Sequence, residues 1–448
     1  MRALLAGSVC LLAAATAAAQ PPVAPATAAT PVPSAISANA TGTATTAVSA
    51  APSAPPTSMS APVVPLSTAL GDTASPESSV NLGEMTAGNP WRMTNTGWWA
   101  QADYLLWWVS SMNTPSLIQA VPTAAAQASV ANNTPLAAGT AQRYFPTTDR
   151  VKFGEFSGVR LNFGYNFDSF GLEASGFYLG QRTQSASLFN DGTPASAAES
   201  YIRAGTGTPV SLFGSLAGQY AGGVASSVSS REWGADTSVR IPWFAFLTNS
   251  TDALAGFRYL ELQEQVSLLN RPAFPNGTTL AISDSFRTRN DFYGAQIGLD
   301  GRIGPTAHGF GLDILGKMAL GGVNERAEIA GSNTYFTPGA APDTQSGGLY
   351  ARGANEGVFT RNIFAAVFEL NTTLTYNFTS WAQVYAGYSI IWLSSAQRPG
   401  DLIDTTINDS QIRFVANPPA NSVTAPIFHW HGTDFTTQGI TIGLRLQY

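Results

Sequence analysis

Charged residues and long apolar runs are both scarce in this chain of 448 residues. Charged side chains make up 11% of the sequence, against about 25% in a typical soluble domain. A soluble protein so poor in charge would have difficulty covering its surface with polar groups. Beyond the N-terminus the longest apolar stretches, such as residues 363–368, are only as long as a strand. This excludes membrane-spanning helices, so any insertion into a membrane requires a closed β-barrel.

Cysteine is nearly absent, since Cys10 is the only one. It lies in a segment with the features of a secretory signal peptide: Arg2 supplies a positive charge, residues 3–15 are apolar, and an Ala-rich cleavage site precedes Gln20. Val9 before Cys10 makes a poor lipoprotein motif, so lipidation is not expected. We therefore predict a signal peptide at residues 1–19, whose removal excludes disulfides, thiol nucleophiles and cysteine-ligated metals.

Signatures of nucleic-acid binding and of common enzymes are also missing. The net charge is −6 and no basic cluster occurs, which argues against nucleic-acid partners. The sequence contains no G-x-S-x-G, P-loop or H-E-x-x-H motif. We therefore expect no enzymatic activity, with no catalytic residue and no cofactor.

Residues 20–90 consist almost wholly of Ala, Pro, Ser, Thr and Val. Such a segment cannot bury enough surface to fold, and its prolines favour extended conformations. We predict a disordered periplasmic tail. A spacer that reaches the cell wall or a partner protein is the alternative, although no binding motif supports it. The ordered domain is predicted to span residues 91–448.

From residue 91 onward, apolar and polar side chains alternate in segments of strand length, each with one apolar and one polar face. The pattern predicts strands at residues 98–108, 157–167, 170–179, 232–241, 253–268, 289–302, 311–320, 359–378, 383–392 and 437–448. The alternation changes at Leu260-Glu261-Leu262, where we expect either a β-bulge or the point at which the strand leaves the lipid.

The predicted strands are long enough for tilted membrane strands, and long connections between them alternate with short ones. Aromatic pairs at predicted strand ends, such as Trp98-Trp99 and Trp107-Trp108, suit a lipid–water interface. The predicted fold class is all-β, an antiparallel transmembrane barrel of about ten strands, with a range of eight to twelve. An even count would leave both termini in the periplasm. A large soluble β-sandwich is the alternative.

The last predicted strand alternates strictly and closes on an aromatic residue. This pattern resembles the C-terminal signal by which bacterial outer-membrane barrels are recognised and inserted, although a soluble strand alternates too. The predicted partners are therefore outer-membrane lipid and the barrel-assembly machinery. The predicted signal residues are Ile440, Ile442, Leu444, Leu446 and Tyr448.

Charged side chains on the polar faces of the strands would line the barrel interior. Cationic and anionic residues nearly balance there, so we expect them to pair with one another rather than select ions. A narrow or plugged barrel and a small-solute pore both remain open. The residues predicted to face the lumen are Asp103, Arg160, Glu173, Asp236, Arg240, Arg258, Asp300, Arg302, Asp313, Lys317, Glu369 and Arg445.

The last long connection contains two short motifs that could carry chemistry. His429-Trp430-His431 has the i, i+2 spacing that can hold a transition metal. His308, however, is predicted at the opposite end of the barrel, and a polar loop is the simpler interpretation, so no metal site is expected. Arg398-Pro399-Gly400-Asp401 is predicted to form a turn with Gly400 at positive φ.

Four segments together resemble the putative beta-barrel porin seven family of bacterial outer membranes. The resemblance spreads over residues 91–448 and implies an outer-membrane barrel, with no established substrate, cofactor or catalytic residue. The segments are residues 99–108, 256–262 and 289–299, and Trp392 with residues 398–404.

These observations predict a porin-like outer-membrane barrel that passes small solutes passively or is plugged and carries long external loops. A structural or adhesive surface barrel is the alternative. A barrel enzyme is more distant, because no Ser–His pair is predicted on adjacent strands. The oligomeric state is left open.

Overall fold

The computed structural model describes residues 96–243, 248, 250–304, 308–415 and 420–447. The predicted signal peptide, the Ala/Pro-rich segment and Tyr448 lie outside the described residues. Ten antiparallel strands form a closed barrel, which confirms the predicted fold class and strand number. These strands are β1 (Gly97–Val109), β6 (Glu155–Asn166), β7 (Gly171–Asn190), β10 (Ala221–Trp243), β11 (Ser250–Ala273), β12 (Thr279–Ile303), β13 (Gly309–Phe336), β15 (Gly357–Asn377), β16 (Ala382–Gln397) and β18 (Gly432–Gln447).

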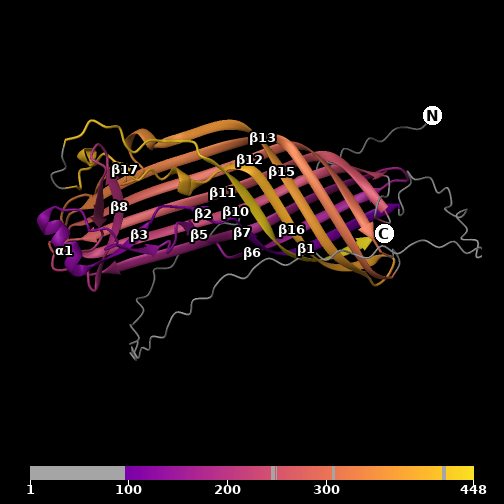
Figure 1. Ribbon diagram of the computed structural model, residues 1–448, viewed down its shortest axis with the longest axis horizontal. Coiled ribbons are helices and arrows are strands. Elements are labelled where there is room, and N and C mark those ends of the chain that lie inside the picture. The colour runs from indigo at the N-terminus through magenta and orange to yellow at the C-terminus, as the bar shows by residue number, and fades with distance from the viewer. Residues whose placement is uncertain (1–95, 244–247, 249, 305–307, 416–419, 448) are drawn as a thin grey trace, which may run out of the picture. The chain divides into compact units, whose positions relative to one another are not determined.

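Each barrel strand pairs with the barrel strands that precede and follow it in the sequence, and β1 closes the ring by pairing with β18. Trp99 lies opposite Gln447, and Gly97 lies opposite Asn166. The beginning of β1, the end of β18 and the short connection 167–170 therefore share one end of the barrel, which we call the turn end. The opposite end, which carries α1, β3, β8 and β17 in Figure 1, is the loop end.

The long connections contribute smaller elements at the loop end. The single α-helix of the described chain is α1 (Thr123–Asn132), and the 3-10 helices are η1 (Gly353–Asn355), η2 (Pro399–Leu402) and η3 (Asp409–Gln411). None of these helices is long and apolar enough to cross a membrane. The remaining strands are β2 (Met112–Asn113), β3 (Ile118–Pro122), β4 (Gln142–Phe145), β5 (Arg150–Val151), β8 (Ala195–Arg203), β9 (Thr208–Phe213), β14 (Asp343–Ser346) and β17 (Thr406–Ile407).

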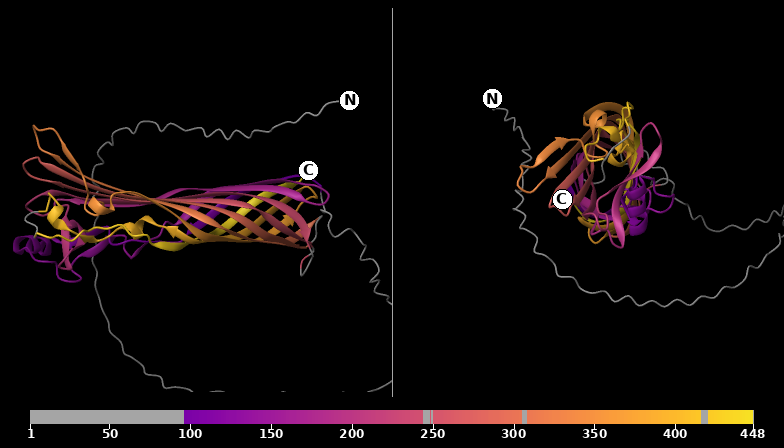
Figure 2. Two further views of the ribbon diagram at one scale, coloured as in Figure 1. Left: turned by 90° about the horizontal axis from the view of Figure 1, so that it is seen from above. Right: turned by 90° about the vertical axis from the view of Figure 1, so that its left-hand side faces the viewer.

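Several strands continue well past their predicted ends toward the loop end. The sequence prediction ended β7 at residue 179 and assigned residues 269–288 to a loop. In the structure β7 runs to Asn190, and β11 and β12 are joined by a tight turn at residues 274–278. Figure 2 shows strands of this region extending beyond the ring. The prediction was wrong here because it required apolar side chains on the outer face.

The bulge considered at Leu260-Glu261-Leu262 is absent, because β11 pairs continuously with β10 and β12 through these residues. Leu260 and Leu262 point inward and are buried, so the two faces exchange polarity without any change of register. The other interpretation, that the strand leaves the apolar band here, fits this geometry. A register shift occurs instead between Ser230 and Glu232, opposite β7.

The ring is closed only in its turn-end half. Past Leu179, β7 pairs with β10 alone, and β16 pairs with β15 only at residues 367–377 of β15. Toward the loop end the wall is therefore an open, curved sheet. Its concave side is filled by the long connections, which pack Leu349, Tyr350 and Ile407 into one apolar cluster with wall residues such as Val266 and Phe286.

Candidate functional site

The outer face of the turn-end half is a continuous apolar band. Ile297, Leu161 and Phe364 are 60%, 58% and 75% exposed there. Toward the loop end this band stops at a row of aromatic side chains, Trp233, Tyr259 and Tyr293, whose successive ring centroids are 4.8 and 5.0 Å apart. Apolar side chains bounded by an aromatic row are typical of the outer surface of a lipid-embedded barrel.

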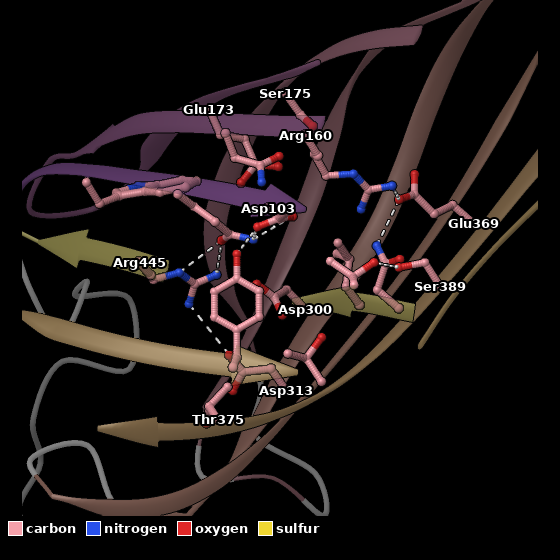
Figure 3. Close-up of a pocket in the computed structure, with 18 of the residues that line it drawn as sticks. Asp103, Arg160, Glu173, Ser175, Asp300, Asp313, Glu369, Thr375, Ser389 and Arg445 are labelled. Carbon is pink, nitrogen blue, oxygen red and sulfur yellow. Dashed lines mark hydrogen bonds and ion pairs between the residues drawn. The ribbon is translucent and has the colours of Figure 1, made fainter. Parts of the chain in front are cut away.

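Inside this band, charged side chains from six strands meet in a connected network. Arg258 of β11 forms ion pairs with Glu369 of β15 and, at 3.6 Å, with Asp236 of β10. Arg160 of β6 binds the same Glu369 at 3.1 Å, as Figure 3 shows. Lys317 of β13 joins Asp236 at 2.7 Å to Glu173 of β7 at 3.3 Å. The network therefore crosses the bore instead of following one wall.

A second group of charges lies nearer the turn end. Arg240 binds three carboxylates, those of Glu173 at 2.8 Å, Asp252 at 2.8 Å and Asp300 at 2.6 Å. Arg240 therefore links this group to the central network through Glu173.

The same level holds a carboxylate shared by two cations. Asp313 accepts an ion pair from Arg302 at 2.6 Å and one from Arg445 at 3.5 Å. Arg445 also donates a hydrogen bond to Gln101 at 2.9 Å. Asp103 differs from its charged neighbours, because Tyr385 and Gln101 hold it by hydrogen bonds. All the residues predicted to face the lumen therefore lie inside the ring and contact other side chains there.

A small cavity lies between these side chains. A cavity of about 80 Å³, shown in Figure 3, is bordered by both groups of charges. A cavity of this size has room for several waters. Among the residues that border the cavity, buried oxygen atoms of Asn371 and Gln383 have no hydrogen-bond partner in the protein.

Several interior residues were not predicted from the sequence. Trp107 was grouped with the interfacial aromatics, but it is fully buried, donates a hydrogen bond to Thr441 at 3.2 Å, and lies under the guanidinium of Arg160. Tyr385 and Asp252 were not named as lumen residues. For Trp107 and Tyr385 the signal was available, because strand alternation places them opposite the outward-facing Trp108 and Val384.

The loop-end half is closed by connections anchored inside it. Arg398 is buried and binds Glu264 of β11 at 2.6 Å, and it donates hydrogen bonds to the carbonyl groups of Ser110 and Ser111. The following residues form η2 rather than the predicted turn with a positive φ at Gly400. Glycine is required there for space, because a Cβ atom would lie 1.9 Å from the carbonyl oxygen of Asn113.

Two buried carboxylates hold other connections to the wall. Asp284 of β12 accepts hydrogen bonds from the backbone N–H groups of Leu349, Tyr350 and Ala351 at 3.1, 3.0 and 2.6 Å. Glu199 of β8 accepts one from Asn270 of β11 at 2.8 Å. Burial, reinforced by the charge of Asp284, raises the pKa of Glu199 to about 8. Burial raises the pKa of Asp284 to about 6, against the effect of its three N–H donors.

The segment around the two neighbouring histidines packs by its aromatic residues. The ring of Phe428 stacks on Phe359 at 3.8 Å, and Arg361 lies 4.5 Å above Trp430. His429 and His431 are exposed. Within the described ranges no group of three or more His, Cys, Asp or Glu residues is placed to hold a metal ion.

The C-terminal strand β18 completes the ring between β1 and β16. Ile440, Ile442 and Leu444 are exposed in the apolar band, and Leu446 follows them on the same face. The role of this strand as an assembly signal stays a prediction, and Tyr448 lies outside the described residues.

A closed antiparallel barrel of ten strands, with an apolar outer band and a charged interior, defines a transmembrane β-barrel. The model of the Putative beta barrel porin-7 family matches residues 99–448, so the chain belongs to this family of outer-membrane barrels. The family is described as a porin and not as an enzyme.

Solved outer-membrane proteins resemble the chain only distantly. The outer membrane protease OmpT from Escherichia coli aligns with 79% of this chain and 98% of its own at 10% identity and a TM-score of 0.39. For OmpT of Vibrio cholerae the shares are 80% and 99%, with 10% identity and a TM-score of 0.13. For the toluene transporter TbuX of Ralstonia pickettii they are 79% and 90%, with 8% identity and a TM-score of 0.17. Scores this low carry no functional argument. No curated protein matches the chain.

Proposed function

We propose that this protein is a plugged outer-membrane barrel that holds a folded surface structure at its loop end and does not act as an open diffusion pore. The observation that carries this proposal is the ion-pair network across the bore, from Arg160 through Glu369 and Arg258 to Asp236 and Lys317. Because these cations have anionic partners, they do not concentrate one kind of ion in the lumen.

The packing of the loop-end half supports the same proposal. A solute that passed the network would next meet an apolar cluster in which Phe286, Leu349 and Tyr350 are fully buried. Movement of the connection between β13 and β15, which carries Leu349 and Tyr350, would break the hydrogen bonds to Asp284. Under this proposal the turn end and the N-terminal segment face the periplasm, and the loop end faces the exterior.

Passage of very small solutes is the second candidate function. The observation that favours it is the cavity of about 80 Å³ among the lumen charges. Such a path would give a small conductance with weak ion selectivity, since the cations and anions that border it are paired. A structural or adhesive role at the loop end would give none.

Planar-bilayer recording of the purified full-length protein separates these candidates. We expect no steps from the wild type, whereas small steps with weak selectivity would favour the second candidate. Arg258→Ala with Lys317→Ala removes two central cations of the network and should raise the conductance. Ser285→Ala, on the outer wall toward the loop end, is the matched control and should leave it unchanged. Nanosiemens steps with strong ion preference from the wild type would contradict the plugged barrel.

A further inference from the structure

A polar pocket of about 190 Å³ lies on the outer wall of β7, β10, β11 and β12. It forms where the pairing of β7 with β10 shifts register, between Ser230 and Glu232. The outward side chains that border it are hydrogen-bond donors on neighbouring strands, namely Gln181, Ser229, Arg231, Gln263, Gln265 and Arg287.

The height of the pocket on the wall is fixed by strand register. Tyr259 marks the aromatic edge of the apolar band, and Gln263 lies four residues further along β11. Four residues of β-strand span about 13 Å, and the strand tilt reduces this to about 10 Å along the barrel axis. The pocket therefore lies just outside the hydrocarbon layer, at the level of lipid headgroups.

The two arginines of the pocket have different side-chain partners. Arg231 is oriented by Gln263 at 2.5 Å and by Glu261 at 3.3 Å, on the side nearer the aromatic row. Arg287 is exposed, and its side-chain partner is Gln265 at 3.2 Å; in the described part of the chain it forms no ion pair. Glu264 also borders the pocket, but its carboxylate is bound by Arg398 inside the wall.

From this geometry we infer a binding site for a phosphorylated headgroup of a lipid in the outer leaflet. Guanidinium groups bind phosphate oxygens through paired charge-assisted hydrogen bonds, and neighbouring amide and hydroxyl groups extend the same donor surface. Below the pocket the ion-paired Glu261 and Arg289 come first. The apolar band beyond them, with Trp233 and Tyr259 at its boundary, would hold the acyl chains of the same lipid. A free phosphate would use the same donors but would gain nothing from the wall.

Native mass spectrometry of the full-length protein in detergent tests this site with three probes: bisphosphorylated lipid A, its dephosphorylated form and inorganic phosphate. The test variant is Arg231→Gln with Arg287→Gln, and the control is Arg413→Gln, an exposed loop arginine paired with Asp343 at 3.2 Å. Heat-modifiable migration on a gel verifies that each variant is folded.

We expect the wild type and Arg413→Gln to bind the phosphorylated lipid equally. The double variant should bind it at least about tenfold more weakly, as expected for the loss of two charge-assisted contacts. Equal binding by the double variant, or equal binding of the dephosphorylated lipid, would overturn the site. If inorganic phosphate bound as tightly as the lipid, the site would be one for free phosphate and not for a lipid headgroup.

Discussion

The turn-end and loop-end halves of this barrel are built from the same strands with opposite polarity. On β11, Arg258 faces the lumen and Phe257 faces outward, whereas Leu262 faces inward and Gln263 outward only a few residues later. Pairing on both sides continues unbroken between these positions. The apolar face of a strand therefore differs between the two halves. In the turn-end half the outer face is apolar because it meets lipid, and in the loop-end half the inner face is apolar because it meets packed loops.

The two halves are also held together differently. In the turn-end half, lipid covers the wall and the interior is joined by ion pairs, whose net contribution to stability is small although breaking one is costly. In the loop-end half, water surrounds the wall, and burial of apolar side chains such as Val266 and Phe286 drives the packing. We therefore expect substitutions on the same face to have different effects in the two halves.

The largest difference is expected on the inner face. Phe286→Ala should destabilise the protein by about 3–5 kcal/mol, because it leaves a cavity in the packed loop-end interior. Asn162→Ala, inside the turn-end half beside the existing cavity, should change stability by no more than about 0.5 kcal/mol. Urea unfolding in detergent measures both. Similar losses at the two positions would mean that the interiors are packed alike.

On the outer face the order should reverse. Ile297→Arg places a charge in the apolar band of β12 and should cost about 2–4 kcal/mol if it lies near the bilayer midplane. Ser285→Arg, on the same face of the same strand in the loop-end half, should cost much less because it lies beyond the apolar band, where a long charged side chain can reach water. Folding titrations in lipid vesicles provide the measurement. If both variants lost stability equally, the boundary between the halves would be misplaced.

A smaller effect is expected where a connection meets the wall of the loop-end half. Gly400→Ala adds a Cβ atom that would lie 1.9 Å from the carbonyl oxygen of Asn113, so η2 must shift. Such overpacking typically costs about 1–3 kcal/mol. Gly316→Ala in the turn-end half has no neighbour within 4 Å of the added atom and serves as the control. Protease sensitivity of the loops at residues 398–415 should increase only in the first variant.

A further effect concerns pH and should be confined to the loop-end half. The folded-state pKa of Glu199 is raised to about 8 from 4.5, so folding favours its neutral form. The stabilising effect is complete below pH 4.5, decreases as the pH rises, and is lost above about pH 8. Asp284 should behave similarly between its ordinary pKa of 3.8 and about 6.

Glu199→Gln imitates the neutral form and should remove most of this dependence. Ionisation of the Glu199 carboxyl group favours the unfolded state of the wild type alone, so the variant should become increasingly more stable than the wild type between pH 5 and pH 8. Hydrogen exchange of β8 measures the change, with β16 in the turn-end half as the internal reference. An unchanged pH profile in the variant would exclude Glu199 as its origin.

The alternation of apolar and polar side chains predicted the strands correctly where one face of a strand met lipid. It predicted the ten strands and placed Leu161 and Ile297 on the outer face. It failed past the aromatic row, where Ser227, Ser229 and other small polar residues alternate with buried ones on β10. Without an apolar outer face, such a segment has the composition of a loop. The long extensions of β7, β10, β11, β12 and β13 were therefore missed.

Some contacts could not be predicted because they depend on residues far apart in the chain. Arg398 and Glu264 are 134 residues apart, and their pairing follows from where the last long connection enters the barrel. The need for glycine at position 400 has the same origin, because the crowding atom belongs to Asn113. The turn motif correctly indicated a need for glycine at position 400, but the reason is lack of space and not a positive φ.

The sequence by itself determined the closed antiparallel barrel, its ten strands and its apolar band, because these follow from the period of two between side chains and from the cost of unpaired backbone groups in lipid. The tertiary structure alone decided which lumen charges pair across the bore, how far the strands extend, and what fills the loop end. Those features depend on contacts between distant segments, and side-chain alternation along one strand carries no information about them.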